Sequence, residues 1–207
     1  MDNDPVRYIL TGSVHIIGAG LSGLSTAVRL ANKGISVIVY EATRHAGGRC
    51  RSYFDKELGQ MIDNGNHLVL SGNQTTLNYI RLIGSFDTVE IVKPAEINFL
   101  DLANNDSWVV RPNKGPIPVS WIRQRSRVPG SSIMDYLKCW KLMRADNDQN
   151  ISDVLPTKGP LWKKFWVPLI VSITNTDAEL ASAGLVRRVL EETLAKGEDA
   201  CRPVLFP

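Results

Sequence analysis

The sequence contains little cysteine, and its few cysteines form no pattern. Cys50, Cys139 and Cys201 are odd in number, lie far apart and make no C-x-x-C pair. This spacing excludes a recognisable cysteine metal site or disulfide framework and is typical of a reducing compartment. We therefore expect a cytoplasmic protein without a metal centre.

Long apolar runs and blocks of like charge are also missing. No run of about 18 apolar residues occurs, so we expect no transmembrane helix, and the acidic start lacks a signal-peptide core. The formal net charge is +3, without a dense Lys/Arg run, so we expect no nucleic-acid partner. With 43% hydrophobic and 22% charged residues, the composition is that of a globular protein of one or two domains.

A glycine motif near the N-terminus carries the clearest signal. An apolar strand that begins at Val14 runs into Gly18-Ala19-Gly20-Leu21-Ser22-Gly23. A helical pattern follows from about Leu21 to Lys33, and a second apolar strand covers 35–40. This order predicts a βαβ unit that binds a dinucleotide, rather than a glycine-rich turn of another α/β fold.

Each glycine of the motif has an expected role. Gly18 closes the tight turn after the first strand, Gly20 lets the backbone approach a pyrophosphate, and Gly23 lets the helix pack against the sheet. Free N–H groups at the helix start and the helix dipole favour an anion there. We therefore expect the whole loop over 18–23 to contact the cofactor.

An acid closes the second strand. Glu41 follows the strand at its carboxyl end, 18 residues after Gly23, close to the spacing expected for a ribose-binding acid. A carboxylate there accepts hydrogen bonds from both hydroxyls of an adenosine ribose and repels a 2′-phosphate, which disfavours NADP. We expect Glu41 and the neighbouring Ala42 to contact the cofactor.

A second glycine element, Gly47-Gly48-Arg49, follows this acid. Two glycines allow a backbone turn close to a ligand, and Arg49 supplies a planar, charged fork for phosphate oxygens; on its own, the element would be a basic surface turn. With Glu41 before it and Ser52 after it, the element resembles the second cofactor motif of FAD-dependent amine oxidases and phytoene desaturases. The resemblance implies that the two motifs bind FAD.

A narrower resemblance follows in the next stretch. The stretch reads Asp63-Asn64-Gly65-Asn66-His67, then three apolar residues, then Ser71-Gly72-Asn73. It resembles the corresponding stretch of the squalene-associated FAD-dependent desaturases, which are the hydroxysqualene dehydroxylases of hopanoid biosynthesis. Trp166-Val-Pro-Leu and Ala200-Cys-Arg-Pro resemble the same family. The resemblance implies an isoprenoid lipid substrate and reductive removal of the hydroxyl of hydroxysqualene to give squalene. It adds four residues to the expected cofactor contacts: Asn64, Gly65, Asn66 and His67.

Members of that family are considerably longer than 207 residues, and a C-terminal segment closes their FAD site. We therefore expect an α/β fold that is incomplete at the C-terminus. It would have a lead-in over 1–12, a Rossmann-like FAD-binding domain over 13–84 and a partial α+β substrate domain over 85–207. We also expect a partner chain to supply the missing segment.

Other functions stay open on the sequence alone. They are an FAD-dependent amine oxidase, a carotenoid or phytoene desaturase, and a truncated, non-catalytic fragment that needs a partner chain. No catalytic residue can be named. Asp63 is a candidate proton donor by position, or it holds its own loop, and we expect His67 to orient its loop near the flavin.

Periodicity predicts further elements beyond the motifs. A helix is expected over 74–83, and strand-like runs over 88–92, 96–101 and 107–111, of which the last two form a hairpin around a turn. A helix over 131–144 would be capped by Ser131 or Ser132. A last helix over 177–196 would open at the capping-box spacing of Thr176 and Glu179.

The stretch over 112–130 is basic and free of acids. It holds Lys114, Arg123, Arg125 and Arg127 around Trp121. With the helix after it, this composition suits the inner face of an anionic membrane, from which a lipid-processing enzyme collects its substrate; the alternative is a solvated loop beside a core helix. The aromatic segment over 162–172 either lines an apolar cavity for an isoprenoid or packs in the core.

Overall fold

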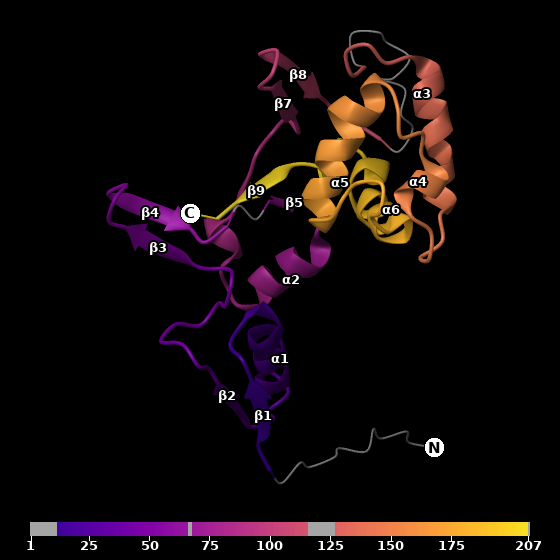
Figure 1. The fold of residues 1–207 in the computed structure, drawn as a ribbon. Coiled ribbons are helices and arrows are strands. Elements are labelled where there is room, and N and C mark those ends of the chain that lie inside the picture. The colour runs from indigo at the N-terminus through magenta and orange to yellow at the C-terminus, as the bar shows by residue number, and fades with distance from the viewer. Residues whose placement is uncertain (1–11, 66–67, 116–126, 207) are drawn as a thin grey trace, which may run out of the picture. The chain divides into compact units, whose positions relative to one another are not determined.

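The chain divides into two compact units (Figure 1). A computed structural model describes residues 12–65, 68–115 and 127–206. The first unit ends at residue 67, and the second unit begins at residue 68. The helix Gln74–Leu82, which confirms the helix expected over 74–83, lies within the second unit.

The first unit contains the expected strand–helix–strand arrangement. Strands β1 (Val14–Ile17) and β2 (Val37–Tyr40) are parallel, with Val14 opposite Val37, and helix α1 (Leu21–Ala31) connects them. The helix ends two residues earlier than expected, and the chain turns at Gly34 with a φ of 76°. Such a left-handed conformation after a helix favours glycine.

An antiparallel hairpin completes the described part of the first unit. Strands β3 (Ser52–Asp55) and β4 (Gln60–Asp63) pair with Ser52 opposite Asp63. The carboxylate of Asp55 accepts hydrogen bonds of 2.9 Å from the backbone N–H groups of Glu57 and Leu58, which fixes the turn. The hairpin leads directly from the second glycine element to the segment over 63–65.

A small sheet in the second unit joins segments that lie far apart in sequence. Strand β9 (Pro203–Leu205) lies between β5 (Val69–Leu70) and β6 (Glu90–Ile91), antiparallel to both. Figure 1 shows the yellow end of the chain crossing beside the magenta strand β5. Helix α2 (Gln74–Leu82) packs Leu77 and Ile80 against Val204.

The predicted hairpin is confirmed. Strands β7 (Ile97–Asp101) and β8 (Asp106–Val110) are antiparallel, and Asn105 takes a φ of 56° in the turn. The rings of Phe99 and Trp108 stack across the pair with centroids 5.5 Å apart. The earlier run at 88–92 forms only the two-residue strand β6, after a 3₁₀ turn at Phe86–Thr88.

The helical stretch expected over 131–144 changes its pitch midway. It forms α3 (Ile133–Lys138) and then a 3₁₀ helix over Cys139–Arg144. Ser132 occupies the N-cap position of α3, and its backbone N–H and hydroxyl both donate to the Asp135 carboxylate, at 2.8 and 2.9 Å. The predicted cap at Ser132 is confirmed.

The prediction for the start of the last helix is wrong. Helix α6 (Ala183–Glu192) begins at residue 183 rather than 177, with the Ser182 hydroxyl accepting from the N–H of Leu185 at 3.3 Å. The Asp177 carboxylate instead accepts from the Glu179 N–H at 2.9 Å and forms a local turn. The 3₁₀ turns Leu194–Lys196 and Glu198–Ala200 then follow, separated by Gly197.

Helices gather around the core of the second unit. They include α4 (Ile151–Val154), a π-helical turn over Trp162–Trp166 and α5 (Val167–Thr174). Leu142, Ile151, Ile170 and Val186 are at most 1% exposed within this core. Among the helices described here, none has the length and apolar character needed to cross a bilayer.

Candidate functional site

The two glycine elements of the first unit lie side by side. The Gly47 N–H donates a hydrogen bond of 2.8 Å to the Ala19 carbonyl, and Gly20 and Gly47 form a parallel β-bridge. Gly47 and Gly48 have φ values of 110° and 61°, a region that favours glycine. The loops over 18–23 and 47–49 therefore form one continuous backbone surface.

The three glycines of the first loop differ in what surrounds them. Gly18 has a φ of 94° at the end of β1, and a Cβ on Gly23 would lie 1.9 Å from the Gly18 carbonyl oxygen. These two positions need glycine for the fold itself. Gly20 has an ordinary φ of −73°, and a Cβ there would meet no atom within 4 Å. The loop thus leaves open space at Gly20.

No acidic residue lies within the first turn of α1. Gly20 occupies the N-cap position, and no side chain caps the helix. The first N–H groups of a helix lack intrahelical partners, and the helix dipole adds partial positive charge there. Both the free N–H groups and the helix dipole would stabilise an anion near Leu21 and Ser22.

Glu41 braces the first loop from the end of β2. One carboxylate oxygen accepts from the Ala19 N–H at 2.7 Å, and the other accepts from the N–H and hydroxyl of Thr43, both at 2.9 Å. The hydrogen bond from the Thr43 backbone, with those from Ala19 and the Thr43 hydroxyl, holds the pKa of Glu41 below its ordinary value. The carboxylate is therefore ionised at neutral pH, and a ribose hydroxyl that reaches it would share it with Thr43 or displace Thr43.

Arg49 presents an exposed side chain that makes no ion pair with any residue in the described ranges. Its loop is fixed through the backbone, because the Asn64 amide donates to the Arg49 carbonyl at 3.2 Å and the Asn64 N–H donates to Arg51 at 2.9 Å. The structure thus brings Asn64 to the second glycine element. Gly65 is half-buried beside it, while Asn66 and His67 lie outside the described residues.

Asp63 is occupied within its own hairpin. The Ser52 hydroxyl donates a hydrogen bond of 2.5 Å to the Asp63 carboxylate, across the paired positions of β3 and β4. Among the described residues, no group of histidines, cysteines and acids could hold a metal ion. The chemistry of the site therefore rests on backbone N–H groups, Glu41 and Arg49.

Ser71 and Gly72 have a structural role in the second unit that sequence reasoning missed. The N–H groups of Ser71 and Gly72 donate to the carbonyls of Arg202 and Ala200, each at 2.8 Å, and the Ser71 hydroxyl donates to the Asp199 carbonyl at 2.6 Å. A Cβ on Gly72 would lie 2.1 Å from the Glu192 carbonyl oxygen. The two family-like strings at 71–73 and 200–203 therefore bind each other.

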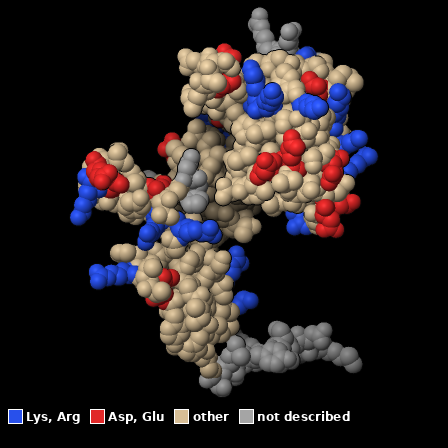
Figure 2. All heavy atoms as spheres, in the orientation of Figure 1, with Lys and Arg blue, Asp and Glu red and all other residues tan. Residues whose placement is uncertain are grey.

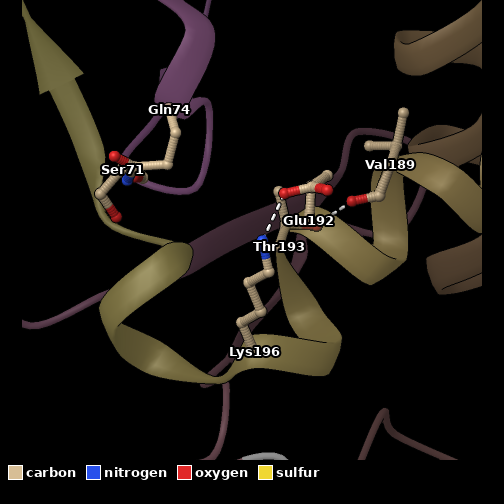
Figure 3. A network of polar contacts seen from close by, with 6 residues as sticks. All are labelled: Ser71, Gln74, Val189, Glu192, Thr193 and Lys196. Atoms are coloured by element: carbon tan, nitrogen blue, oxygen red, sulfur yellow. Dashed lines mark hydrogen bonds and ion pairs between the residues drawn. The ribbon is translucent and has the colours of Figure 1, made fainter. Parts of the chain in front are cut away.

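Side-chain contacts extend this junction (Figure 3). The Gln74 amide donates to the Ser71 carbonyl at 2.7 Å, and the Thr193 hydroxyl donates to the Val189 carbonyl at 2.6 Å. Lys196 pairs with Glu192. These three contacts join residues only three or four positions apart, whereas Asp199 and Arg202, the partners of Ser71, come from the far end of the chain.

The second unit also contains an apolar cavity of about 170 Å³. Phe165 and Trp166, from the segment expected to line a cavity or to pack in the core, do both: each is buried in the core and each lines the cavity. Trp140 and Cys139 contribute from the 3₁₀ helix that follows α3. Burial raises the pKa of Cys139 to about 11, so its thiol is neutral.

Known proteins match this sequence over most of its length. The sequence profile of the flavin containing amine oxidoreductases matches residues 21–163. The hydroxysqualene dehydroxylase of Rhodopseudomonas palustris is 44% identical over 95% of this chain and 47% of its own length. The corresponding enzyme of Sinorhizobium fredii is 44% identical over 93% of this chain and 46% of its own length.

A solved structure supports the fold. Cyclohexylamine oxidase from Brevibacterium oxydans matches 94% of this chain and 46% of its own chain, with a TM-score of 0.55 and 20% identity. At that identity the likeness shows the fold alone. The chain thus spans about half the length of the curated relatives that it matches.

Proposed function

Because the chain belongs to the family of flavin-containing amine oxidoreductases, we propose that its first unit binds FAD and that the protein acts on an isoprenoid lipid. The reaction would be the reductive dehydroxylation of hydroxysqualene to squalene in hopanoid biosynthesis. The observation that carries this substrate is the 44% identity, over 95% of this chain, to a protein named hydroxysqualene dehydroxylase. The observation that carries the cofactor site is the hydrogen bond between Gly47 and Ala19, which unites the two glycine loops.

The residues of the first unit fit the pyrophosphate of FAD. The open space at Gly20 admits a phosphate where a side chain would block it, and the uncapped start of α1 offers N–H groups to its oxygens. Arg49, exposed and without an ion pair among the described residues, would neutralise the second phosphate charge. The pyrophosphate would contact the whole loop over 18–23, together with Gly47 and Gly48.

The adenosine end of the cofactor would lie at Glu41 and Ala42. The ionised carboxylate accepts hydrogen bonds and repels a 2′-phosphate, so the site suits a ribose with free hydroxyls. Asn64, which holds the Arg49 loop, and Gly65 would position the backbone near the cofactor. We assign Asn66 and His67 to the same contact on the resemblance alone, because they lie outside the described residues.

The chemistry that reduced FAD would supply, when bound, is a hydride for the carbon that loses the hydroxyl group; the hydroxyl would take up a proton and leave as water, and the flavin would end oxidised. The chain's own residues bind and orient the cofactor, and an apolar surrounding excludes water from the reacting centre. We assign no proton donor. The Ser52–Asp63 hydrogen bond favours a loop-holding role for Asp63 over a role as catalytic acid.

We further propose that the second unit contacts an anionic membrane surface through α3 and the turn after it. Four apolar side chains, each between 39% and 62% exposed, lie on this stretch: Ile133, Met134, Leu137 and Trp140. Lys138, Lys141 and Arg144 are exposed among them, and Figure 2 shows blue side chains over the edge of this unit where α3 lies in Figure 1. Exposed apolar side chains flanked by basic ones suit the interface of an anionic bilayer.

The loop expected to share this contact is described only at its ends. Lys114 and Arg127 fall in the described ranges, whereas Trp121, Arg123 and Arg125 lie outside them. Since the chain spans about half of its relatives, we propose that turnover needs the other half, in a longer form of the chain or in a partner chain.

The test of the proposed function is turnover with a chemically reduced cofactor. The protein, with any partner chain that completes it, would be loaded with FAD, reduced and supplied with hydroxysqualene in detergent. We expect squalene in the organic extract, and none from the Gly20→Val variant. Formation of hydrogen peroxide from amines, with no squalene, would instead identify the amine oxidase alternative, and desaturation of phytoene or a carotenoid would identify the desaturase alternative.

A further inference from the structure

The volume of the cavity in the second unit limits the size of the group that it can hold. Its volume is about 170 Å³, close to the engineered apolar cavity of about 150 Å³ that stays dry and binds benzene. A group of five or six carbon atoms fills such a space. A longer chain would enter with one end only.

Three polar side chains of the wall, Tyr136, Cys139 and Trp166, already have partners. The Tyr136 hydroxyl accepts from the Val128 N–H at 2.9 Å, and the Trp166 indole N–H donates to the Cys139 sulfur at 3.2 Å. The Cys139 thiol in turn donates to the Asp135 carbonyl at 3.1 Å. A polar ligand would have to break these bonds, whereas an apolar ligand leaves them intact.

Most of the wall is buried apolar surface, and one side reaches the exterior. Leu142, Leu161, Phe165 and Leu190 line the cavity and are each at most 7% exposed. Trp140, also in the wall, is 61% exposed. The cavity therefore opens beside Trp140, which lies in the turn after α3 and is one of the four exposed apolar side chains proposed to contact the membrane.

We infer that this cavity holds one branched, five-carbon end of an isoprenoid chain, which enters beside Trp140. The inference rests on the proposed function for the choice of an isoprenoid, and on the cavity for the size and place of the group held. The rest of the chain would then extend outward past Trp140. The cavity would therefore select substrates whose chain ends in such a branched group.

Methyl NMR of the 207-residue chain tests this inference without FAD or turnover. With ¹³C-labelled methionine methyl groups, Met143 reports from the cavity wall, whereas Met61 is exposed in the first unit and serves as an internal control. The probe is prenol, the five-carbon branched alcohol, with farnesol as the longer form. We expect a saturable shift of the Met143 signal, assigned with Met143→Leu, while the Met61 signal stays unchanged.

A cavity-filling variant provides the matched comparison. Ala195 lines the cavity, so Ala195→Phe should weaken prenol and farnesol binding at least tenfold. Ala103→Phe, in the exposed turn between β7 and β8, should bind as the original chain does. The Met134 signal would show whether Ala195→Phe folds. If it does not fold, Ala195→Leu replaces it as the cavity-filling variant.

The outcomes separate this inference from the proposed function. A Met143 shift with no squalene formation by the completed enzyme would keep the cavity site and overturn the proposed reaction. Squalene formation with no Met143 shift would overturn the cavity site alone. Equal binding of straight-chain 1-dodecanol and farnesol would overturn the assignment of a branched end.

Discussion

The backbone N–H of Gly47 donates a hydrogen bond of 2.8 Å to the carbonyl of Ala19. This contact joins two loops that the sequence separates by a helix and a strand. Together with the Gly20–Gly47 bridge, it makes one backbone surface out of two short glycine elements. A single glycine-rich turn of an unrelated α/β fold has no need for the second loop, so this junction supports the proposal of a dinucleotide site.

Gly20→Val should abolish FAD binding and leave the fold intact. The backbone at Gly20 suits any residue, and a Cβ meets no protein atom within 4 Å, so the added side chain begins in the open space proposed for the pyrophosphate. The dissociation constant, measured by flavin fluorescence quenching, should rise at least about tenfold, or about 1.4 kcal/mol. Normal flavin affinity in this variant would move the pyrophosphate elsewhere.

Gly23→Ala should destabilise the first unit instead. Its Cβ would lie 1.9 Å from the Gly18 carbonyl oxygen, so β1 and α1 must separate, at a cost of about 1–3 kcal/mol. Thermal unfolding followed by circular dichroism measures this change. An unaltered unfolding curve would show that the close approach of helix and strand is unimportant.

Glu41→Ala should weaken FAD binding by roughly 10- to 100-fold, the scale of lost charged hydrogen bonds. Isothermal titration with FAD gives the dissociation constant. Thr43→Val is the matched control, because it removes one hydroxyl contact to Glu41 and keeps the carboxylate. An unchanged dissociation constant for Glu41→Ala would place the ribose away from β2.

The pH dependence of stability should also involve Glu41. Its pKa in the folded chain lies below the ordinary value of 4.5, so the ionised carboxylate stabilises the fold fully above that value. The stabilisation is lost as the pH falls through the lowered pKa. The unfolding temperature should therefore fall more steeply below about pH 4.5 in the original chain than in Glu41→Gln. Parallel curves for the two proteins would contradict this account.

Gly72→Ala should destabilise the second unit by about 1–3 kcal/mol. The added Cβ would meet the Glu192 carbonyl at 2.1 Å and that of Ala200 at 2.8 Å, two backbone atoms that hold the chain end in place. Gly115→Ala in the same unit is the control, since its Cβ meets nothing within 4 Å. Urea unfolding of both variants measures the difference, and equal midpoints would refute the role of Gly72.

Leu137→Ser and Trp140→Ser should reduce binding to anionic vesicles. Both side chains are more than 60% exposed on the stretch that carries Lys138 and Lys141, and the membrane contact would bury them. Co-sedimentation with phosphatidylglycerol vesicles should fall several-fold, whereas Leu180→Ser, at another exposed leucine of the second unit, should have no effect. If the original chain does not sediment with these vesicles, the membrane proposal is wrong.

Local patterns predicted the elements that local forces determine. The glycine motif and the period of apolar residues predicted β1, α1 and β2, and turn residues predicted the β7–β8 hairpin. The start of the last helix was missed because Asp177 turns back on Glu179, a local alternative that uses the same residues as a capping box. The π-helical turn at Trp162–Trp166 also carried no signal in the sequence.

The sequence did not predict the hydrogen bonds between residues that lie far apart along the chain. Glu41 was expected to face a ribose, and its hydrogen bonds to Ala19 and Thr43 depend on how β2 meets the glycine loop. The sequence presents Ser71 and Gly72 only as part of a family-like string, and their partners lie near the chain's other end. Such contacts are determined by tertiary packing, which no periodicity encodes.

The most direct test of the account is the visible absorption spectrum of the 207-residue chain after addition of FAD and removal of the excess by gel filtration. The account predicts flavin absorption bands that elute with the protein, and their loss in the folded Gly20→Val variant. Absence of flavin from the folded original chain, or equal flavin in both proteins, would contradict the assignment of the cofactor site to these two loops.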